Sequence, residues 1–304
     1  MAANLRIGID TGGTFTDIVC VDDHSGAMRV TKVASTPTNP SIGLVRGVNA
    51  ILCASGAGVD NVAVLAHGTT VATNALLQGE IAGLGLIVTQ GFRHILEIAR
   101  QAVPEGYGNS YFWVKPERIV PLQFIREVGG RFNFLGEELR PLDEPSVRAA
   151  ALFFRERGIT AVGVCLMHSY ANTAHEQRVA KIIAEDYPDC IVSLSSDVLP
   201  EYREYERAMT TLVDAFVKPH MGRYLERIRD ELGPALSQKP FLVMQSSGGV
   251  ASPDQVMRKP ITTALSGPAA GALGSAVIAE IAEFPDVVTL DAGGTSTDLC
   301  LIEG

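Results

Sequence analysis

Apolar and polar positions along the chain follow two different periods, which predicts interleaved strands and helices. Short apolar or β-branched runs have the length of strands, and longer runs with apolar residues three or four positions apart have the period of helices. The predicted strands are Leu5–Asp10, Phe15–Val21, Val62–Ala66, Gly85–Val88, Ala161–Leu166, Ile191–Ser195, Phe241–Gln245 and Val287–Asp291. The predicted helices are 70–78, one opening at 91–93, 143–157, 175–186, 204–232 and a small-residue helix ending near Ala282. This order is typical of α/β layers.

Three stretches interrupt the regular pattern. Val103–Gly136 loses periodicity and contains several prolines and aromatic residues, which predicts an irregular excursion or an inserted subdomain. Pro219 lies inside a long helical pattern, so we expect a break or kink there. Ser266–Gly271 is rich in small residues and has a proline, and we expect a loop that precedes the last helix.

One motif occurs twice. Gly8–Asp17 and Thr289–Asp298 each place an apolar strand before an aspartate, two glycines in a turn, then hydroxyl residues and a second aspartate. An ordinary type I′ hairpin turn also favours glycine, and that interpretation would suffice for a single copy. A plain hairpin needs no particular acid before the turn, however, nor a threonine and an aspartate after it. The duplication therefore favours a pair of phosphate-binding hairpins.

The residue types in both copies suit that chemistry. Glycine lets the backbone approach an anion without a Cβ clash, so that consecutive N–H groups can point at phosphate oxygens. The predicted phosphate-binding residues of the two turns are Thr11, Gly12, Gly13, Thr14, Gly293, Gly294, Thr295 and Ser296. Asp10 and Asp291, at matching positions, suit a Mg²⁺ ion that is held mainly through water, and we assign both a catalytic role. The chain has no Walker loop and no convincingly placed dinucleotide fingerprint.

Composition and charge exclude several classes of protein. With 304 residues, 46% of them hydrophobic and 19% charged, the chain is long enough for two globular domains. The net charge of -9 disfavours nonspecific binding to nucleic acid. The five cysteines are widely spaced and suit reduced thiols, and no apolar stretch is long enough to cross a bilayer. We therefore expect a cytoplasmic protein without nucleic-acid or membrane partners.

Paired hairpins of this kind resemble the phosphate loops of the actin/hexokinase/Hsp70 superfamily. Several further phrases look like the hydantoinase A/oxoprolinase family: His67–Leu76, Gly91–Arg93, Arg100–Gln101, His168–Tyr170, Glu204–Arg207 and Ser266–Gly271. The resemblance implies an α/β fold of the actin/hexokinase/Hsp70 type (ribonuclease H-like), with mixed sheets and flanking helices. It also implies an N-terminal domain over residues 1–200 with the first phosphate loop. Residues 201–304 would begin an ATPase domain that holds the second loop and is incomplete.

The resemblance further implies an A subunit of an ATP-dependent hydrolase that opens hydantoin or 5-oxoproline rings. ATP and Mg²⁺ are the implied cofactors, a hydantoinase B-type subunit is the implied partner, and a small cyclic amide or ketone is the substrate. The alternatives are a β subunit of an acetone or acetophenone carboxylase, or a nucleotide-dependent regulatory or kinase module of the same fold. Because family members continue past the second hairpin, we expect the isolated chain to be inactive.

Three further positions have two possible interpretations. His67 follows an apolar strand and precedes Gly-Thr-Thr, where it could face a substrate from a cleft or simply belong to a helix cap. We assign His67 a catalytic role. Asn74 falls one turn further along the same helix. His168 ends a strand, where open α/β sheets place ligands, but it could equally be a buried structural histidine. Gly267 could bring backbone close to a nucleotide or pack two elements tightly.

Overall fold

The computed structural model describes residues 4–36, 39–77, 83–100, 117–292 and 297–304. By its internal contacts the chain forms two compact units. Unit 1 contains Met1–Gln78 and His220–Gly304, and unit 2 contains Gly79–Pro219. This division by packing differs from the sequence domains 1–200 and 201–304, which stay a prediction. Each unit is described by itself below.

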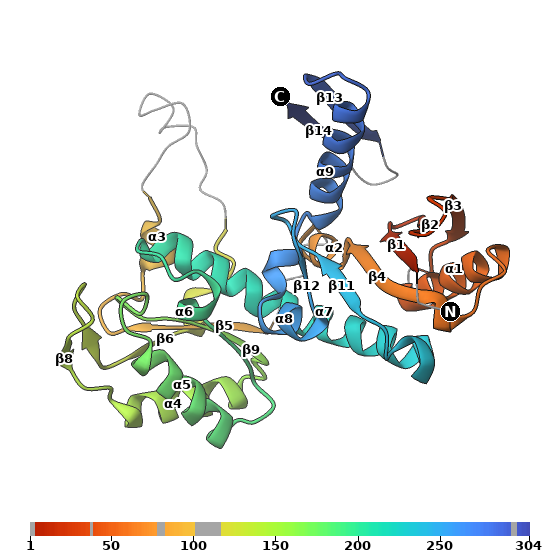
Figure 1. The fold of residues 1–304 in the computed structure, drawn as a ribbon. Coiled ribbons are helices and arrows are strands. Elements are labelled where there is room, and N and C mark those ends of the chain that lie inside the picture. Colours follow the sequence, from red (N-terminus) through yellow and green to blue (C-terminus); the bar gives the residue numbers. More distant parts are fainter. Residues whose placement is uncertain (1–3, 37–38, 78–82, 101–116, 293–296) are drawn as a thin grey trace. The chain divides into compact units, whose positions relative to one another are not determined.

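Unit 1 is built on a six-stranded mixed sheet. Its strand order is β12-β11-β4-β1-β2-β3 (Figure 1). The strands are β1 (Leu5–Thr11), β2 (Phe15–Asp22), β3 (Met28–Ala34), β4 (Val62–Thr69), β11 (Phe241–Met244) and β12 (Val250–Ala251). β1 pairs in parallel with β4, and β4 with β11, while β1, β2 and β3 form an antiparallel meander. The predicted first hairpin is therefore the centre of this sheet.

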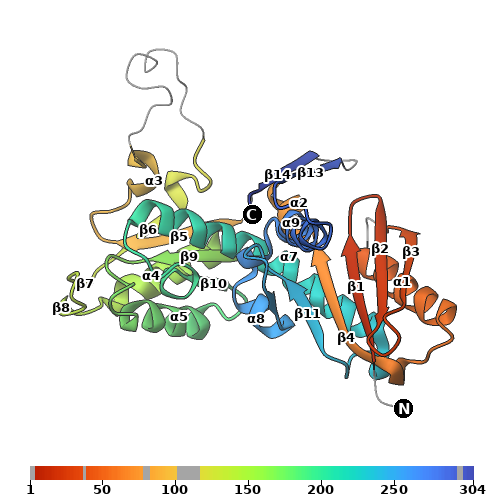
Figure 2. The same cartoon turned by 45° about the horizontal axis from the view of Figure 1, so that its top comes forward.

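Two helices cover one face of the sheet. In α1 (Pro40–Ala54), Gly47 lies so close to Ile18 of β2 that a Cβ atom would sit 2.1 Å from its Cδ1. In α7 (Glu204–Leu236), Tyr224 contacts His67 of β4. Ile9 is the cross-strand partner of both Ile18 and His67, and partners in a sheet share a face. Figure 2 shows β1 between β2 and β4. Alternate residues of β1 are buried under helices, and Asp10 lies on the opposite, exposed face.

The remainder of unit 1 includes a second, smaller sheet. The helices α2 (Val71–Leu77), α8 (Pro253–Arg258) and α9 (Ser266–Ile281) follow β4, β12 and a short 3-10 turn. The strands β13 (Val287–Ala292) and β14 (Thr297–Ile302) form a two-stranded antiparallel hairpin beside α9. The expected loop at Ser266–Gly271 is wrong, because these residues form the first turns of α9. Pro268 fits there since the first N–H groups of a helix have no partner within it.

The long helix α7 does not break where the sequence predicts. It continues through Pro219, and its one non-helical residue is Gly233, with φ 70° and ψ 172°. Gly233 precedes Pro234, and a residue before proline is disfavoured in the helical region. Glycine also reaches positive φ without steric cost. The Gly-Pro pair therefore interrupts the helix, and the prediction of a break at Pro219 was wrong.

Unit 2 is built on a parallel four-stranded sheet of order β10-β9-β5-β6. Its strands are β5 (Leu84–Thr89), β6 (Ile125–Val128), β9 (Ala161–Cys165) and β10 (Ile191–Leu194). Its helices include α3 (Ile95–Ile98), α4 (Glu144–Glu156), α5 (Ala174–Asp186) and α6 (Ser195–Val198), and β7 (Arg131–Phe132) pairs with β8 (Glu138–Arg140). The apolar faces of α4 and α5 supply Phe154, Ile182 and Ile183 to one buried core with Val162 and Val164 of β9.

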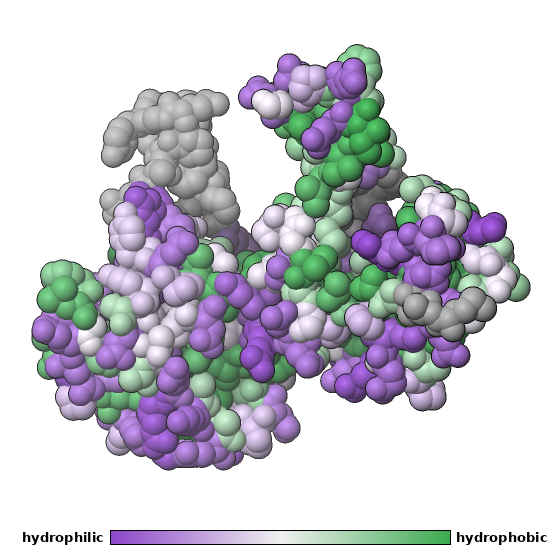
Figure 3. All heavy atoms as spheres, in the orientation of Figure 1, coloured by the Kyte–Doolittle hydropathy of each residue, from purple (hydrophilic) through white to green (hydrophobic). Residues whose placement is uncertain are grey.

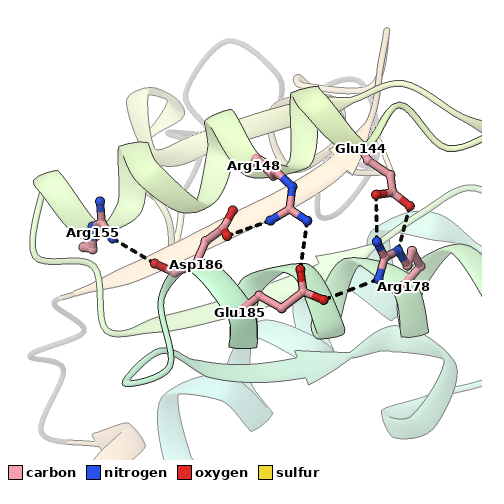
Figure 4. Close-up of polar contacts among 6 residues, drawn as sticks. All are labelled: Glu144, Arg148, Arg155, Arg178, Glu185 and Asp186. Carbon is pink, nitrogen blue, oxygen red and sulfur yellow. Dashed lines mark hydrogen bonds and ion pairs between the residues drawn. The ribbon is translucent and has the colours of Figure 1, made fainter.

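Ion pairs join α4 to α5 on the solvent side of unit 2 (Figure 4). Arg178 makes a two-pronged contact with Glu144 at 2.7 Å for each bond, and Arg148 binds both Glu185 and Asp186. Exposed ion pairs are individually weak, typically below about 1 kcal/mol. The apolar core therefore supplies most of the packing energy between the two helices.

The stretch predicted to be irregular, 103–136, lies partly outside the described residues. Its described part contains strands β6 and β7 and a 3-10 turn at Leu122–Phe124, so the loss of periodicity does not mean a loss of structure. Two-residue and four-residue strands are too short to produce a clear alternation. Among the helices that the structure describes, none is long and apolar enough to cross a membrane.

Candidate functional site

The tip of the first hairpin is held in place by β3. The Gly12 N–H donates to Phe15 O at 3.0 Å and closes the turn, which leaves Gly13 and Thr14 exposed at the tip. Ser35, directly after β3, donates through Oγ to Gly12 O and through its N–H to Thr14 O. A cradle for an anion must be rigid before the ligand arrives. The Ser35 contacts supply that rigidity to the predicted phosphate turn.

Two carboxylates stand opposite each other on this hairpin. Asp10 of β1 and Asp17 of β2 are cross-strand partners, and Asp17 also forms an ion pair with Lys32 at 3.1 Å. Dehydration by the surrounding protein raises the pKa of Asp10, and the charges of Asp17 and Asp291 raise it further. Facing like charges destabilise a sheet unless a cation offsets them. The charge of Asp291 on the second hairpin therefore reaches Asp10 on the first, within unit 1.

Gly68 provides the space that the Asp10 carboxylate occupies. It is the partner of Asp10 on β4, and a Cβ atom at this position would lie 3.3 Å from Asp10 Oδ1. Immediately beyond it, Thr70 Oγ1 donates to Thr11 O at 3.2 Å, and Asn74 Nδ2 donates to Thr70 Oγ1. The predicted cleft segment around Asn74 therefore adjoins the first hairpin.

Helix α9 begins at the same edge of the sheet. Leu265, its N-cap, has a left-handed backbone with φ 60°, and its N–H donates to Thr73 Oγ1 at 3.0 Å. Ser266 is fully buried and donates through Oγ to Thr69 O. Gly267 follows inside the first turn, so the backbone of this phrase lies close to the ends of β4 and α2. Whether Gly267 contacts a nucleotide stays a prediction.

His67 lies beneath the hairpin rather than on an exposed surface. It is completely buried, and burial lowers its pKa to about 4, so the imidazole is neutral at physiological pH. Its Nδ1 lies 3.4 Å from Ile9 O, which can only accept, so Nδ1 carries the proton. Nε2 is then an acceptor for the Tyr224 hydroxyl at 2.7 Å. This geometry gives His67 a packing role, and its catalytic role stays a prediction.

The Tyr224 hydroxyl extends this chain of contacts toward the hairpin. Burial raises the pKa of Tyr224 strongly, and the hydroxyls of Thr69 and Thr11 beside it lower that pKa. Thr11 Oγ1 is buried next to the phenol without a hydrogen bond of normal geometry among the described residues. Side chains of neighbouring strand residues point to opposite faces, so Thr11 faces inward while Asp10 faces outward. Thr11 could then reach a phosphate through its backbone, not its side chain.

The second hairpin repeats the carboxylate arrangement of the first. Asp291 of β13 and Asp298 of β14 are cross-strand partners, as Asp10 and Asp17 are. The predicted phosphate-binding residues Gly293, Gly294, Thr295 and Ser296 lie outside the described residues. Within the described residues no three His, Cys, Asp or Glu side chains converge to hold a metal ion. Mg²⁺ commonly takes only one or two protein carboxylates and completes its shell with water and phosphate, so Asp10 and Asp291 fit it.

Several members of this edge were not recognised in the sequence. Ser35 contacts the hairpin, Gly68 adjoins Asp10, and Tyr224 contacts His67 of β4. Leu265 contacts Thr73 of α2. Gly68 alone left a signal, since a glycine between a strand and a helix indicates a close approach of backbone or side chain. Tyr224 left no signal in the sequence, because a tyrosine in an amphipathic helical pattern does not show which residue it will contact.

Comparison with known proteins supplies the relationship. Residues 6–187 match the model of the hydantoinase/oxoprolinase N-terminal region, and residues 207–304 match the hydantoinase/oxoprolinase model. The chain belongs to the hydantoinase/oxoprolinase family. The family resemblance read from the motifs is therefore confirmed.

The relatives include both amide hydrolases and carboxylases. The chain is 37% identical to the caprolactamase subunit alpha of Pseudomonas jessenii, covering 98% of this chain and 43% of that protein. It is 32% identical to 5-oxoprolinase 1 of Arabidopsis thaliana, over 99% of this chain and 26% of that protein. The nucleotide-free structure of acetone carboxylase superposes with a TM-score of 0.90 and 27% identity, over 99% of this chain and 44% of the other. The fold is thus the predicted actin/hexokinase/Hsp70 type, and this chain spans less than half of each relative.

Proposed function

We propose that this chain is the ATP-handling part of an enzyme that opens cyclic amides of the hydantoin or 5-oxoproline type. The observation that carries the proposal is the pair of aspartate-bearing hairpins in unit 1, in which the charge of Asp291 helps to raise the pKa of Asp10. An ATP-dependent family with caprolactamase and 5-oxoprolinase among its members supports an amide substrate. The reaction would be ATP-driven activation of the ring carbonyl, followed by addition of water.

The residues have separate roles in this proposal. ATP supplies a phosphoryl group that makes an amide carbonyl carbon more reactive toward water. Asp10 and Asp291 hold Mg²⁺, and the exposed backbone of Gly13 and Thr14 faces the phosphates. The cross-strand partner Asp17 adds negative charge that favours a bound cation. Gly68 leaves room for the Asp10 carboxylate, because a Cβ atom there would lie 3.3 Å from Asp10 Oδ1 and the carboxylate would have to shift slightly.

The proposal includes a partner and a cellular location. We infer a hydantoinase B-type subunit that completes the ring opening, in a hetero-oligomer. We also infer a cytoplasmic enzyme, because all five cysteines are free. Burial raises the pKa of Cys165 to about 11, so its thiol stays protonated.

A carboxylase is the second candidate. The TM-score of 0.90 to acetone carboxylase supports it. The two hairpins of unit 1 are also equally suited to ATP-driven activation of a ketone oxygen. In both reactions the residues of this chain would bind phosphate and metal in the same way. The difference lies in the organic substrate and the partner subunit.

A coupled phosphate assay on the complete enzyme with its partner subunit separates the two candidates. We expect hydantoin or 5-oxoproline to stimulate ATP hydrolysis about tenfold or more over the basal rate, and acetone to have little effect. Caprolactam is included as an uncharged lactam substrate, and the Asp10→Ala variant, purified in the same way, corrects for contaminating ATPase. Stimulation by acetone alone would replace the hydrolase with the carboxylase.

A further inference from the structure

The carboxyl edge of the unit 2 sheet is arranged like a ligand-binding edge. The strands follow one another as β5, β6, β9 and β10 along the chain but lie in the order β10-β9-β5-β6. The connections that leave β5 and β9 therefore run in opposite directions. In open parallel sheets, ligands bind beyond the carboxyl ends of the two strands where this reversal occurs. Here these ends are followed by Gly91–Arg93 and His168–Tyr170.

A buried polar network fixes the segments at this edge. The fully buried Glu176 accepts hydrogen bonds from Leu166 N–H at 2.8 Å and Ser195 Oγ at 2.7 Å. The fully buried Arg207 donates to Leu166 O at 2.6 Å and to Ser195 Oγ at 3.1 Å. The ends of β9 and β10 and the start of α7 are thus joined through one acid, one base and one serine. Buried charged groups in such a network are weak evidence for stability, and their best-attested use is to fix one arrangement.

Strained backbone lies on both sides of this network. His168 and Arg203 have φ values of 59° and 85°, in the left-handed region that residues with a side chain rarely adopt. His168 follows Leu166 by two residues, and Arg203 O accepts from Arg207 N–H at 3.2 Å. Strain of this kind persists where surrounding contacts impose it, and it concentrates at ligand sites.

The side chains at this edge present hydrogen-bonding groups in a positive field. His168 is only partly buried, and its Nδ1 lies 3.1 Å from the Tyr170 hydroxyl. Dehydration lowers the pKa of His168, as do the charges of Arg131 and Arg207, while Glu204 opposes them. The imidazole is then neutral, with one N–H and one lone pair. The guanidinium of Arg207 also lies 5.4 Å from the Tyr170 ring centre. Because one of these two neutral groups donates to the other, the pair keeps one free donor for a ligand. The guanidinium charge of Arg207 beside it favours an oxygen that bears partial or full negative charge.

We propose that this edge of unit 2, centred on His168 and Tyr170, binds the organic substrate through a carbonyl or carboxylate oxygen. The identity of that ligand rests on the proposed function, but the site itself is separate from the phosphate hairpins of unit 1. Arg207 and Glu176 are positioning residues here, since both are buried and hold the strand ends. His168 and Tyr170 are the groups that contact the ligand.

Titration of the isotope-labelled chain by NMR, in the absence of nucleotide, tests the site. We expect the His168 imidazole signals to shift saturably with 5-oxoproline. If the ring carbonyl is recognised, 2-pyrrolidinone gives the same shift and acetate does not. If the carboxylate is recognised, acetate does and 2-pyrrolidinone does not. No saturable shift with any of the three compounds overturns the proposal.

Variants connect the signal to the residues. His168→Asn removes the imidazole with a residue that tolerates left-handed backbone, and Tyr170→Phe removes only a hydroxyl. We expect each to weaken 5-oxoproline binding at least fivefold, whereas His94→Asn, an exposed histidine of the same unit, changes it less than twofold. Unchanged affinity in folded His168→Asn and Tyr170→Phe contradicts the site. A parallel titration of the same chain with Mg²⁺ pyrophosphate reports on unit 1. If pyrophosphate does not bind but 5-oxoproline does, the proposed function is contradicted and the His168 site is not.

Discussion

The two hairpins carry nearly the same motif in very different surroundings. Taking Asp10 and Asp291 as equivalent, Ile9 corresponds to Leu290 and Ile18 to Leu299. The first pair is buried, with 4% and 0% exposure, and the second is open to solvent, with 68% and 70%. β1 has a strand on each side and helices over one face, whereas β13 pairs with β14 alone among the strands that the structure describes. The motif therefore encodes the turn and its acids, and the neighbouring elements decide how firmly the turn is held.

The strongest test of this comparison concerns function, in which the two hairpins should be equal. We expect Asp10→Ala and Asp291→Ala each to reduce ATP-coupled turnover of the complete enzyme by about 1,000-fold, because each removes a proposed ligand of Mg²⁺. Both acids are solvent-exposed, so the fold should persist in both variants. Steady-state phosphate release measures the loss.

The matched control is Asp254→Ala, an exposed acid in the first turn of α8. Its turnover should stay within about twofold of the parent enzyme, as expected of a surface substitution away from any site. Full activity in both hairpin variants would remove the metal assignment. A loss in only one of them would mean that a single hairpin handles the phosphates.

Stability should separate the hairpins where function does not. We expect Ile9→Ala to lower the free energy of unfolding by about 2–5 kcal/mol, since it leaves a cavity under α1 and α7. Leu290→Ala should change it by less than about 0.5 kcal/mol, because the side chain is exposed. Urea denaturation of the 304-residue chain, followed by circular dichroism, measures both. Equal losses would show that the second hairpin is as well packed as the first.

The smallest expected effect comes from His67, which supports only the first hairpin. Its pKa is about 4 when folded against an ordinary value of 6.5, so the unfolded chain binds more protons between these values. Stability then falls as the pH drops through this window, by about 2 kcal/mol between pH 7 and pH 5. Urea denaturation at both pH values measures the difference. His67→Gln should remove that part of the pH dependence, and an unchanged slope in the variant would contradict the burial of a neutral imidazole.

The sequence predicted most elements of the fold because their patterns are local. The strand runs around Asp10 and Asp291 and the amphipathic period of α4 and α5 depend only on neighbouring residues. The duplicated motif pointed to the superfamily and to the paired acids, and the further phrases such as His67–Leu76 pointed to the family. These features need no knowledge of what packs on them.

What the sequence did not predict depends on contacts between distant residues. The sequence around His67 suits a cleft as well as a helix cap, and contacts with Tyr224, 157 positions away, and with Phe241 show the imidazole to be enclosed. The start of α9 was misplaced because small residues and a proline suggest a loop whenever their helical neighbours are unknown. The break in α7 at Gly233 is different, because it has a local cause: Gly233 precedes a proline and reaches positive φ without steric cost.

The uncovered second hairpin also determines how the chain will behave at high concentration. Val288, Leu290, Leu299 and Leu301 form an exposed apolar face on a two-stranded sheet, and α9 beside it exposes Ile278 and Ile281. Figure 3 shows hydrophobic surface over α9. Exposed apolar surface next to an unpaired strand edge promotes aggregation. Charge repulsion from a net charge of -9 works against it and weakens as salt is added. The purified chain should therefore stay in solution in dilute, low-salt buffer. In concentrated, high-salt stocks it should aggregate and raise the turbidity.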